Sequence, residues 1–301
     1  PHTLADFAEY QAQWQEAIYG NFRNWKIWQC PPNGQGIVAL LMLALMDKTP
    51  PVKNSNPHDL PNLHYLRQYA DITRYAYTWR DKIVGDPPAN SVVDWGEQIR
   101  TAYAAADEQL PIISATPQPE HKDTVYLSVI DGSGLAISLI NSIFHPFGSG
   151  ITTAQSGVLL HNRGLSFSLE RDKANSLDGR KRPLHTIIPA IAEGSNGEVL
   201  SFGVMGGHYQ AAGQAWFLSR WLDNSCDLQQ ALDTPRIFNY PDALYIEKTF
   251  PADLQQQLTA AGYVLQHCAE PLGGGQAVLR TAAGQYSAAS DSRKDGIAVG
   301  F

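Results

Sequence analysis

The chain has 301 residues, of which 44% are hydrophobic and 17% charged, a composition typical of a globular protein with a sizeable core. Lys and Arg total 22 against 29 Asp and Glu, and no basic stripe offsets the net charge of −7. This balance argues against nucleic acid or an anionic membrane surface as a partner. No apolar run approaches the roughly 20 residues that a membrane-spanning helix needs, so we expect no membrane partner.

The cysteines and the first residues carry little functional signal. Three cysteines without a C-x-x-C pair argue against a disulfide framework or a thiolate zinc site. The chain begins at Pro1 with neither Met nor a signal-peptide pattern, so we expect its start to lie inside a longer domain. The sequence leaves open a cytoplasmic or periplasmic location, and it leaves open a homo-oligomer.

The first 120 residues are predicted to be mainly helical. Thr3 fits the N-cap of a helix that carries Leu4, Phe7 and Trp14 at helical spacing. Further elements are expected, in chain order, as a β-like run at 25–29 and helices at 36–46, 66–75 and 94–109.

The rest of the chain is rich in predicted strands. Residues 112–122 are polar and irregular, the composition of an exposed loop. A turn at 132–134 joins two alternating runs, 124–131 and 135–142, as expected for a β-hairpin. Further strands are expected at 157–160, 199–204, 277–281 and 286–289, and helices at 210–223 and 252–261. The predicted helices are concentrated in the first part of the chain and the predicted strands in the second, an order that favours a layered α/β architecture.

Several chemistries are excluded by missing motifs. The chain has no phosphate-binding P-loop, no G-x-S-x-G nucleophile elbow and no H-E-x-x-H zinc helix. Its nine histidines show no metal-ligand spacing.

Thr124 stands at the junction of the predicted loop and the predicted hairpin. From spacing alone it is a strand-edge threonine, because threonine favours strands. Gly206 and Gly207 follow a β-like run and precede a predicted helix. Two backbone N–H groups can point at one spot in such a place, and a tight strand-to-helix turn explains the glycines equally well.

Several segments resemble, in order and spacing, the γ-glutamyltransferase family. Those similar to its small subunit are 124–129 (TVYLSV), 147–150 (FGSG), 156–164 (SGVLLHNRG), 181–184 (KRPL), 206–207 (GG) and 290–293 (SDSR). Those similar to the end of its large subunit are 31–36 (PPNGQG) and 85–87 (GDP). The resemblance covers essentially the whole chain, and we expect the family's N-terminal segment to be missing from it.

The resemblance implies a fold and a processing event. The family folds as a four-layer αββα sandwich of the N-terminal-nucleophile hydrolase type, an α+β layered class. We expect the sandwich to be incomplete here, with the missing N-terminal segment of the precursor as its partner. The resemblance places self-cleavage between Asp123 and Thr124. Residues 1–123 then correspond to the large-subunit end and 124–301 to the catalytic small subunit, together in one structural domain.

The resemblance also implies a mechanism without metal or organic cofactor. Thr124 would be the nucleophile, and its freed α-amine the general base. The Gly206 and Gly207 N–H groups would hold the oxyanion. Ser142 falls where the family has a threonine that supports the nucleophile.

The expected substrate-binding residues depart from the γ-glutamyl pattern. Phe144 replaces an asparagine, Ser166 replaces an acidic residue, and His185 and Thr186 replace a serine pair. These departures, together with Arg163 and His208, resemble the family's acylase-like branch.

Three functional readings follow for this chain. The first is a γ-glutamyltransferase-like enzyme acting on small amides such as glutathione. The second is an acylase that cuts another side-chain amide. The third is an unprocessed or inactive precursor, because the chain runs unbroken from Asp123 to Thr124.

Overall fold

The computed structural model describes residues 3–52, 59–88, 91–106, 123–224 and 226–301. At its centre lies a six-stranded antiparallel sheet in the order β1-β2-β5-β6-β10-β11. Its strands are β1 (Ile18–Phe22), β2 (Trp25–Gln29), β5 (Ala190–Gly194), β6 (Val199–Met205), β10 (Gly274–Arg280) and β11 (Tyr286–Ser290). Strands from the first and last parts of the chain thus share one sheet.

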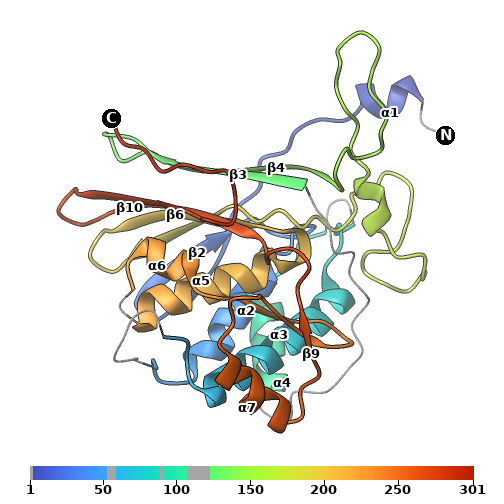
Figure 1. Ribbon diagram of the computed structural model, residues 1–301. Helices are drawn as coiled ribbons and strands as arrows, with labels where there is room; N and C mark the ends of the chain where they lie inside the picture. The colour runs from blue at the N-terminus through green and yellow to red at the C-terminus, as the bar shows by residue number, and fades with distance from the viewer. Residues whose placement is uncertain (1–2, 53–58, 89–90, 107–122, 225) are drawn as a thin grey trace.

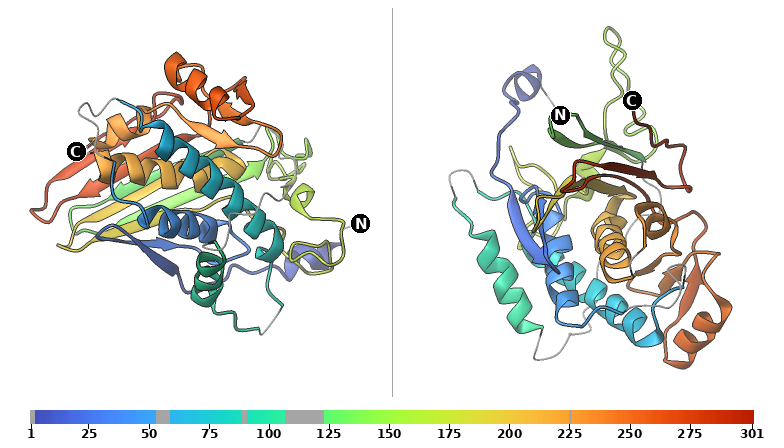
Figure 2. Two further views of the ribbon diagram at one scale, coloured as in Figure 1. Left: turned by 90° about the horizontal axis from the view of Figure 1, so that it is seen from below. Right: turned by 90° about the vertical axis from the view of Figure 1, so that its left-hand side faces the viewer.

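Helices cover one face of this sheet (Figures 1 and 2). They are α2 (Gly36–Asp47), α3 (Leu63–Ile83), α4 (Trp95–Ala105), α5 (Gln210–Asn224) and α6 (Leu228–Asp233). The α2 helix is apolar on all sides and buries ten of its residues between β1, α3 and α5. A helix that is hydrophobic all round has to be enclosed, so α2 forms the middle of the core.

The opposite face carries the hairpin of β3 (Asp123–Ile130) and β4 (Ala136–Phe144), which lies over β6 and β10 (Figure 1). The Tyr126 ring rests on Gly203, where an added Cβ would come within 2.5 Å of the ring. The Ser128 hydroxyl donates to the Ser201 carbonyl, and the Ser201 hydroxyl donates to the Ile137 carbonyl, each at 2.8 Å. Short polar side chains and a glycine therefore hold the two layers close together.

The outer face of the hairpin has the reverse character. Its exposed side chains are large and apolar: Val125, Leu127, Val129, Ile137 and Leu139. A hairpin normally presents its polar face to water, so both faces of this one have the composition of contact surfaces.

A small third sheet lies beside the helices, with β7 (Ile237–Asn239), β8 (Leu244–Ile246) and β9 (Leu265–His267) flanked by α7 (Ala252–Ala260). A buried ion-pair network joins it to the central sheet. Arg236 pairs with Asp291, and Arg293 pairs with both Asp291 and Glu247.

Most of the predicted elements are confirmed, and the mixed α+β class with them. The hairpin, the apolar helix, β6, β10, β11, α5 and α7 lie where the sequence patterns place them. Two predictions are wrong. The first helix, α1, ends at Ala8 and leaves Trp14 fully exposed, because the segment extends away from the body (Figure 1). Residues 157–160 form a loop with one bridge between Leu159 and Thr152. The predicted loop 112–122 lies outside the described residues.

Gly203→Ala is expected to lower stability by ~1–3 kcal/mol, because the new methyl group pushes Tyr126 off the central sheet. Gly132→Ala is the control, since an added Cβ there meets nothing within 4 Å. Urea denaturation of both variants measures the difference. Equal midpoints would show that the hairpin does not depend on this close contact.

Asp291→Asn is expected to destabilise the fold by about 3–5 kcal/mol at neutral pH, because it leaves buried Arg236 without its carboxylate. Burial raises the pKa of Asp291, but Arg236 and Arg293 outweigh burial and hold the pKa below its usual value. Such a depressed pKa stabilises the fold above the unfolded-state pKa, and this stabilisation is lost as pH falls through the folded-state pKa. The gap between wild type and variant therefore narrows below about pH 4. Denaturation curves at two pH values test this, with exposed Asp295→Asn as the control.

Candidate active site

Thr124 lies near the start of β3, at a point where the pairing with β4 is irregular. The register shifts between Asp123 and Thr124, and Thr124 stands opposite Ser142. Only 8% of Thr124 is exposed, and its hydroxyl donates to the Ser142 hydroxyl at 3.0 Å. Strand alternation places Thr124 on the same face as buried Tyr126, so it points inward, against the central sheet.

Ser142 connects Thr124 to a buried arginine. Arg163, from a single 3₁₀ turn (Arg163–Ser166), donates from Nη2 to the Ser142 hydroxyl at 2.9 Å and from Nη1 to the Thr186 hydroxyl at 2.8 Å. The guanidinium of Arg163 lies over the Phe144 ring, with its Cζ 4.3 Å from the ring centroid. Two hydrogen bonds thus connect the Thr124 hydroxyl, through the Ser142 hydroxyl, to the positive charge of Arg163.

Two histidines beside Arg163 are held neutral. Burial, followed by repulsion from Arg163 and His161, lowers the pKa of His185 to about 3. Burial and the Arg163 charge also lower the pKa of His161. At neutral pH the positive charge of this cluster therefore resides on Arg163 alone.

Gly206 and Gly207 form the turn between β6 and α5. Both have positive φ, +115° and +59°, which glycine adopts without strain. A short 3₁₀ turn (Gly207–Tyr209) continues directly into α5, so their N–H groups stand at the start of a helical segment. The first N–H groups of a helix lack intrahelical partners and favour negative charge. This turn is suited to holding an oxyanion.

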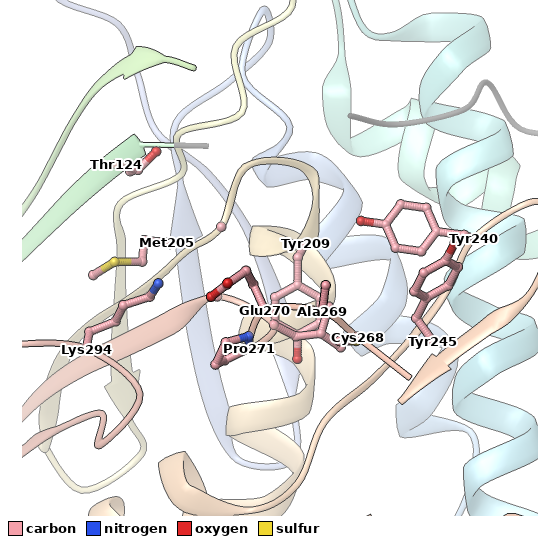
Figure 3. A pocket seen from close by; sticks show the side chains of 13 residues that line it. Thr124, Met205, Tyr209, Tyr240, Tyr245, Cys268, Ala269, Glu270, Pro271 and Lys294 are labelled. Carbon is pink, nitrogen blue, oxygen red and sulfur yellow. The ribbon is translucent and has the colours of Figure 1, made fainter. Parts of the chain in front are cut away.

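Thr124 and Gly206 line the same cavity, which has a volume of about 340 Å³ (Figure 3). Glu270 and Lys294 stand at its charged end, where both side-chain tips point inward, and Tyr240 and Tyr245 form an aromatic end. The remaining lining residues are Met205, Tyr209, Cys268, Ala269, Pro271, Leu272 and Gly273.

One wall of the cavity is anchored by the buried ion-pair network. Leu272 donates its N–H to Glu247 at 3.0 Å, and its carbonyl accepts from Arg236 at 2.8 Å. Gly273 then packs on Gly206 so closely that a Cβ on Gly206 would lie 2.7 Å from the Cα of Gly273. The network thereby supports the turn beside Thr124.

The other expected site residues lie away from the cavity lining. The Ser166 hydroxyl oxygen lies 2.8 Å from the carbonyl oxygens of both Arg163 and Leu184, which share its one proton. His208 is buried against Arg80, with Nδ1 2.8 Å from Nη1. These two residues do not line the cavity, and neither do Phe144, His185 and Thr186.

Sequence reasoning missed the wall formed by Tyr240, Tyr245, Glu270 and Lys294. The signals were present in the glycine run 273–275 and in the motif that ends at Arg293, directly before Lys294. Neither pattern tells which side chains enclose space.

Within the described ranges, no three His, Cys, Asp or Glu side chains are grouped as a metal site. None of the described helices has the length and hydropathy to cross a membrane.

Comparisons with known proteins place this geometry in a family. The family model described as gamma-glutamyltranspeptidase matches residues 1–301. The chain is 30% identical to the glutathione hydrolase-like YwrD proenzyme of Bacillus subtilis, over 99% of this chain and 58% of that protein. It is also 30% identical to the oxamate amidohydrolase proenzyme of Klebsiella pneumoniae, over 100% of this chain and 58% of that protein.

A solved structure supports the same relationship. The cephalosporin acylase from Bacillus halodurans superposes with a TM-score of 0.83 and 30% identity, over 97% of this chain and 54% of that one. The chain thus spans somewhat more than half the length of these relatives. With the family model matching every residue, this chain belongs to the gamma-glutamyltranspeptidase family.

Proposed function

We propose that the chain is the nucleophile-bearing part of an amide hydrolase or acyltransferase whose nucleophile is Thr124. The observation that carries the proposal is the shared cavity: the nearly buried hydroxyl of Thr124, hydrogen-bonded to Ser142, and the Gly206 turn line the same space. A nucleophile, an oxyanion site and room for a substrate are the elements that acyl transfer requires.

The first proposed step is cleavage of the Asp123–Thr124 bond. The Thr124 hydroxyl attacks the Asp123 carbonyl, the amide becomes an ester, and water hydrolyses the ester. The products are the Asp123 carboxylate and a free Thr124 α-amine. An α-amine has an ordinary pKa near 8, so it can accept a proton close to neutral pH.

The second proposed step is turnover of a substrate amide. The α-amine takes the proton of the Thr124 hydroxyl as the oxygen attacks the amide carbonyl, and it passes that proton to the departing amine. The N–H groups of Gly206 and Gly207 stabilise the oxyanion by roughly 3–4 kcal/mol for a well-aimed donor. Water, or an acceptor amine, releases the acyl group. None of these steps uses a metal or an organic cofactor.

We also propose that cleavage divides the chain into regions 1–123 and 124–301 of one structural domain. The described layers are then three of an αββα sandwich, with a further layer over the outer hairpin face. The apolar row of that face supports this, because large hydrophobic side chains are costly to leave in water. The remaining length of the precursor is the proposed occupant.

The acyl group is proposed to be γ-glutamyl or another side-chain acyl group. The first reading draws on the glutathione hydrolase-like relative, the second on the acylase of known structure. The sequence favours the second reading, because Ser166 and Phe144 depart from the γ-glutamyl pattern, although neither residue lines the cavity.

Thr124→Ala is expected to abolish both cleavage and amide hydrolysis, because the attacking oxygen is gone, with amidase activity at least about 1,000-fold lower. Thr124→Ser keeps a hydroxyl and should retain cleavage. Intact-mass and gel analysis of the full-length proteins reads out cleavage, with exposed Thr259→Ala as the control. A single uncleaved band and no amidase activity from the unmutated protein would favour the inactive-precursor reading.

Kinetic measurements on the cleaved protein distinguish the two proposed acyl groups, γ-glutamyl and another side-chain acyl group. A γ-glutamyl anilide is compared with aliphatic and aromatic acyl anilides through release of the aniline. Equal or better turnover of the acyl anilides removes the γ-glutamyl reading.

A further inference from the structure

Arg163 is a buried cation without a counter-charge. Only 3% of the residue is exposed, and no described carboxylate lies within ion-pair distance of its guanidinium. Burial of the unpaired charge lowers the pKa of Arg163 to about 10. An unpaired buried charge is destabilising, so a fold that keeps one gains stability when an anion arrives with a ligand.

The donors of Arg163 are also incompletely used. A guanidinium has five N–H groups. In Arg163, Nη1 donates to the Thr186 hydroxyl and Nη2 to the Ser142 hydroxyl, while Nε has no partner among the described residues. Both acceptors are neutral, and His161 and His185 beside them are neutral as well. A planar guanidinium with spare donors matches a carboxylate, which it can bind through two parallel hydrogen bonds.

The distance from Arg163 to the nucleophile limits where that carboxylate can sit. Through Ser142, two hydrogen bonds of 3.0 and 2.9 Å hold the Thr124 hydroxyl oxygen within about 6 Å of Nη2. A carboxylate oxygen sits about 2.8 Å from a guanidinium nitrogen, and an attacked carbonyl carbon about 3 Å from the nucleophile. The carboxylate and the carbonyl can therefore lie a few ångströms apart. A direct bond or one methylene group bridges such a span with fewer rotatable bonds to order than the three carbons of a γ-glutamyl chain.

The uncleaved chain closes this side of Arg163. The Phe144 ring covers the guanidinium, and Phe144 pairs with Asp123, the residue before the proposed cleavage site. Cleavage cuts the chain directly after the residue that pairs with Phe144, whose positive φ of +79° is a conformation that a non-glycine residue holds only under constraint. A shift of Phe144 after this cut would open a route for a carboxylate to Arg163.

We propose that Arg163 binds the carboxylate of the acyl group, and that the substrates are amides with a carboxylate on, or one methylene from, the scissile carbonyl. This inference rests on the proposed Thr124 amidase. The acyl group lies toward Arg163, and the departing amine lies in the cavity between Gly206, Glu270 and Lys294.

The test compares anionic amides with neutral amides of the same shape on the cleaved full-length protein. The pairs are oxamate with pyruvamide and malonamate with acetoacetamide, with glutamine as the longer γ-amide, and ammonia release gives kcat/KM. We expect kcat/KM for at least one anionic member to exceed that of its neutral partner about 100-fold or more, and to exceed that of glutamine. Oxalate or malonate should inhibit competitively.

Arg163→Gln should collapse the anionic-to-neutral ratio toward one and abolish inhibition by oxalate and malonate, whereas Arg163→Lys should keep part of both. Exposed Arg171→Gln, elsewhere on the same loop region, is the matched control and should leave the ratio unchanged. An unchanged ratio in Arg163→Gln overturns the inference. If that variant fails to fold or to cleave, the wild-type ratio decides, because equal turnover of pyruvamide and oxamate is incompatible with a carboxylate site.

Failure of the inference is distinguishable from failure of the proposed function. Amidase activity without carboxylate preference removes only the role of Arg163. Absence of activity on every amide removes the amidase and the inference with it.

Discussion

The backbone contact between Gly206 and Gly273 is the constraint on which the candidate site depends. Neither residue can carry a Cβ, because on Gly273 it would lie 2.3 Å from the Met205 carbonyl oxygen. Gly206 begins the turn beside the cavity, and Gly273 belongs to the wall that the Arg236–Asp291–Arg293–Glu247 network anchors. Burying an ion network carries a large desolvation penalty, but its directional hydrogen bonds hold the loop at Leu272 and Gly273 in one position.

The two sides of Thr124 differ in their electrostatics. On one side, Ser142 connects it to Arg163, a cation that no described acid neutralises. On the other side, Glu270 and Lys294 contribute opposite charges to an open cavity with tyrosines at its far end. The first environment favours a compact anion, and the second accommodates a larger group of mixed polarity. Under the proposed mechanism, this asymmetry gives the substrate a direction across Thr124, with the acyl part on the enclosed side.

The sequence predicted elements whose signal is local and missed features that arise at long range. The alternation on either side of Gly132 and the all-apolar run of α2 sufficed for the hairpin and the buried helix. Strands of three residues, such as β7, β8 and β9, carry too little periodicity to be recognised. The cavity wall joins Tyr240 to Lys294 through tertiary packing alone. Arg163 was expected at the substrate from family resemblance, but its unpaired charge became visible only with its burial.

Under the proposed mechanism, one bond controls two properties of the site. Before cleavage the Thr124 nitrogen is an amide without basicity, and the strand through Asp123 holds Phe144 over Arg163. Cutting that bond creates the α-amine that serves as the base, and it interrupts β3 next to the residue that pairs with Phe144. A precursor would then lack both the α-amine base and the anion site, so it could cut its own chain but could neither activate Thr124 toward a substrate amide nor retain a substrate carboxylate beside it. A single peptide bond can control both the basicity of the Thr124 nitrogen and access to Arg163, because β3 carries Thr124 and also pairs with the strand end that bears Phe144.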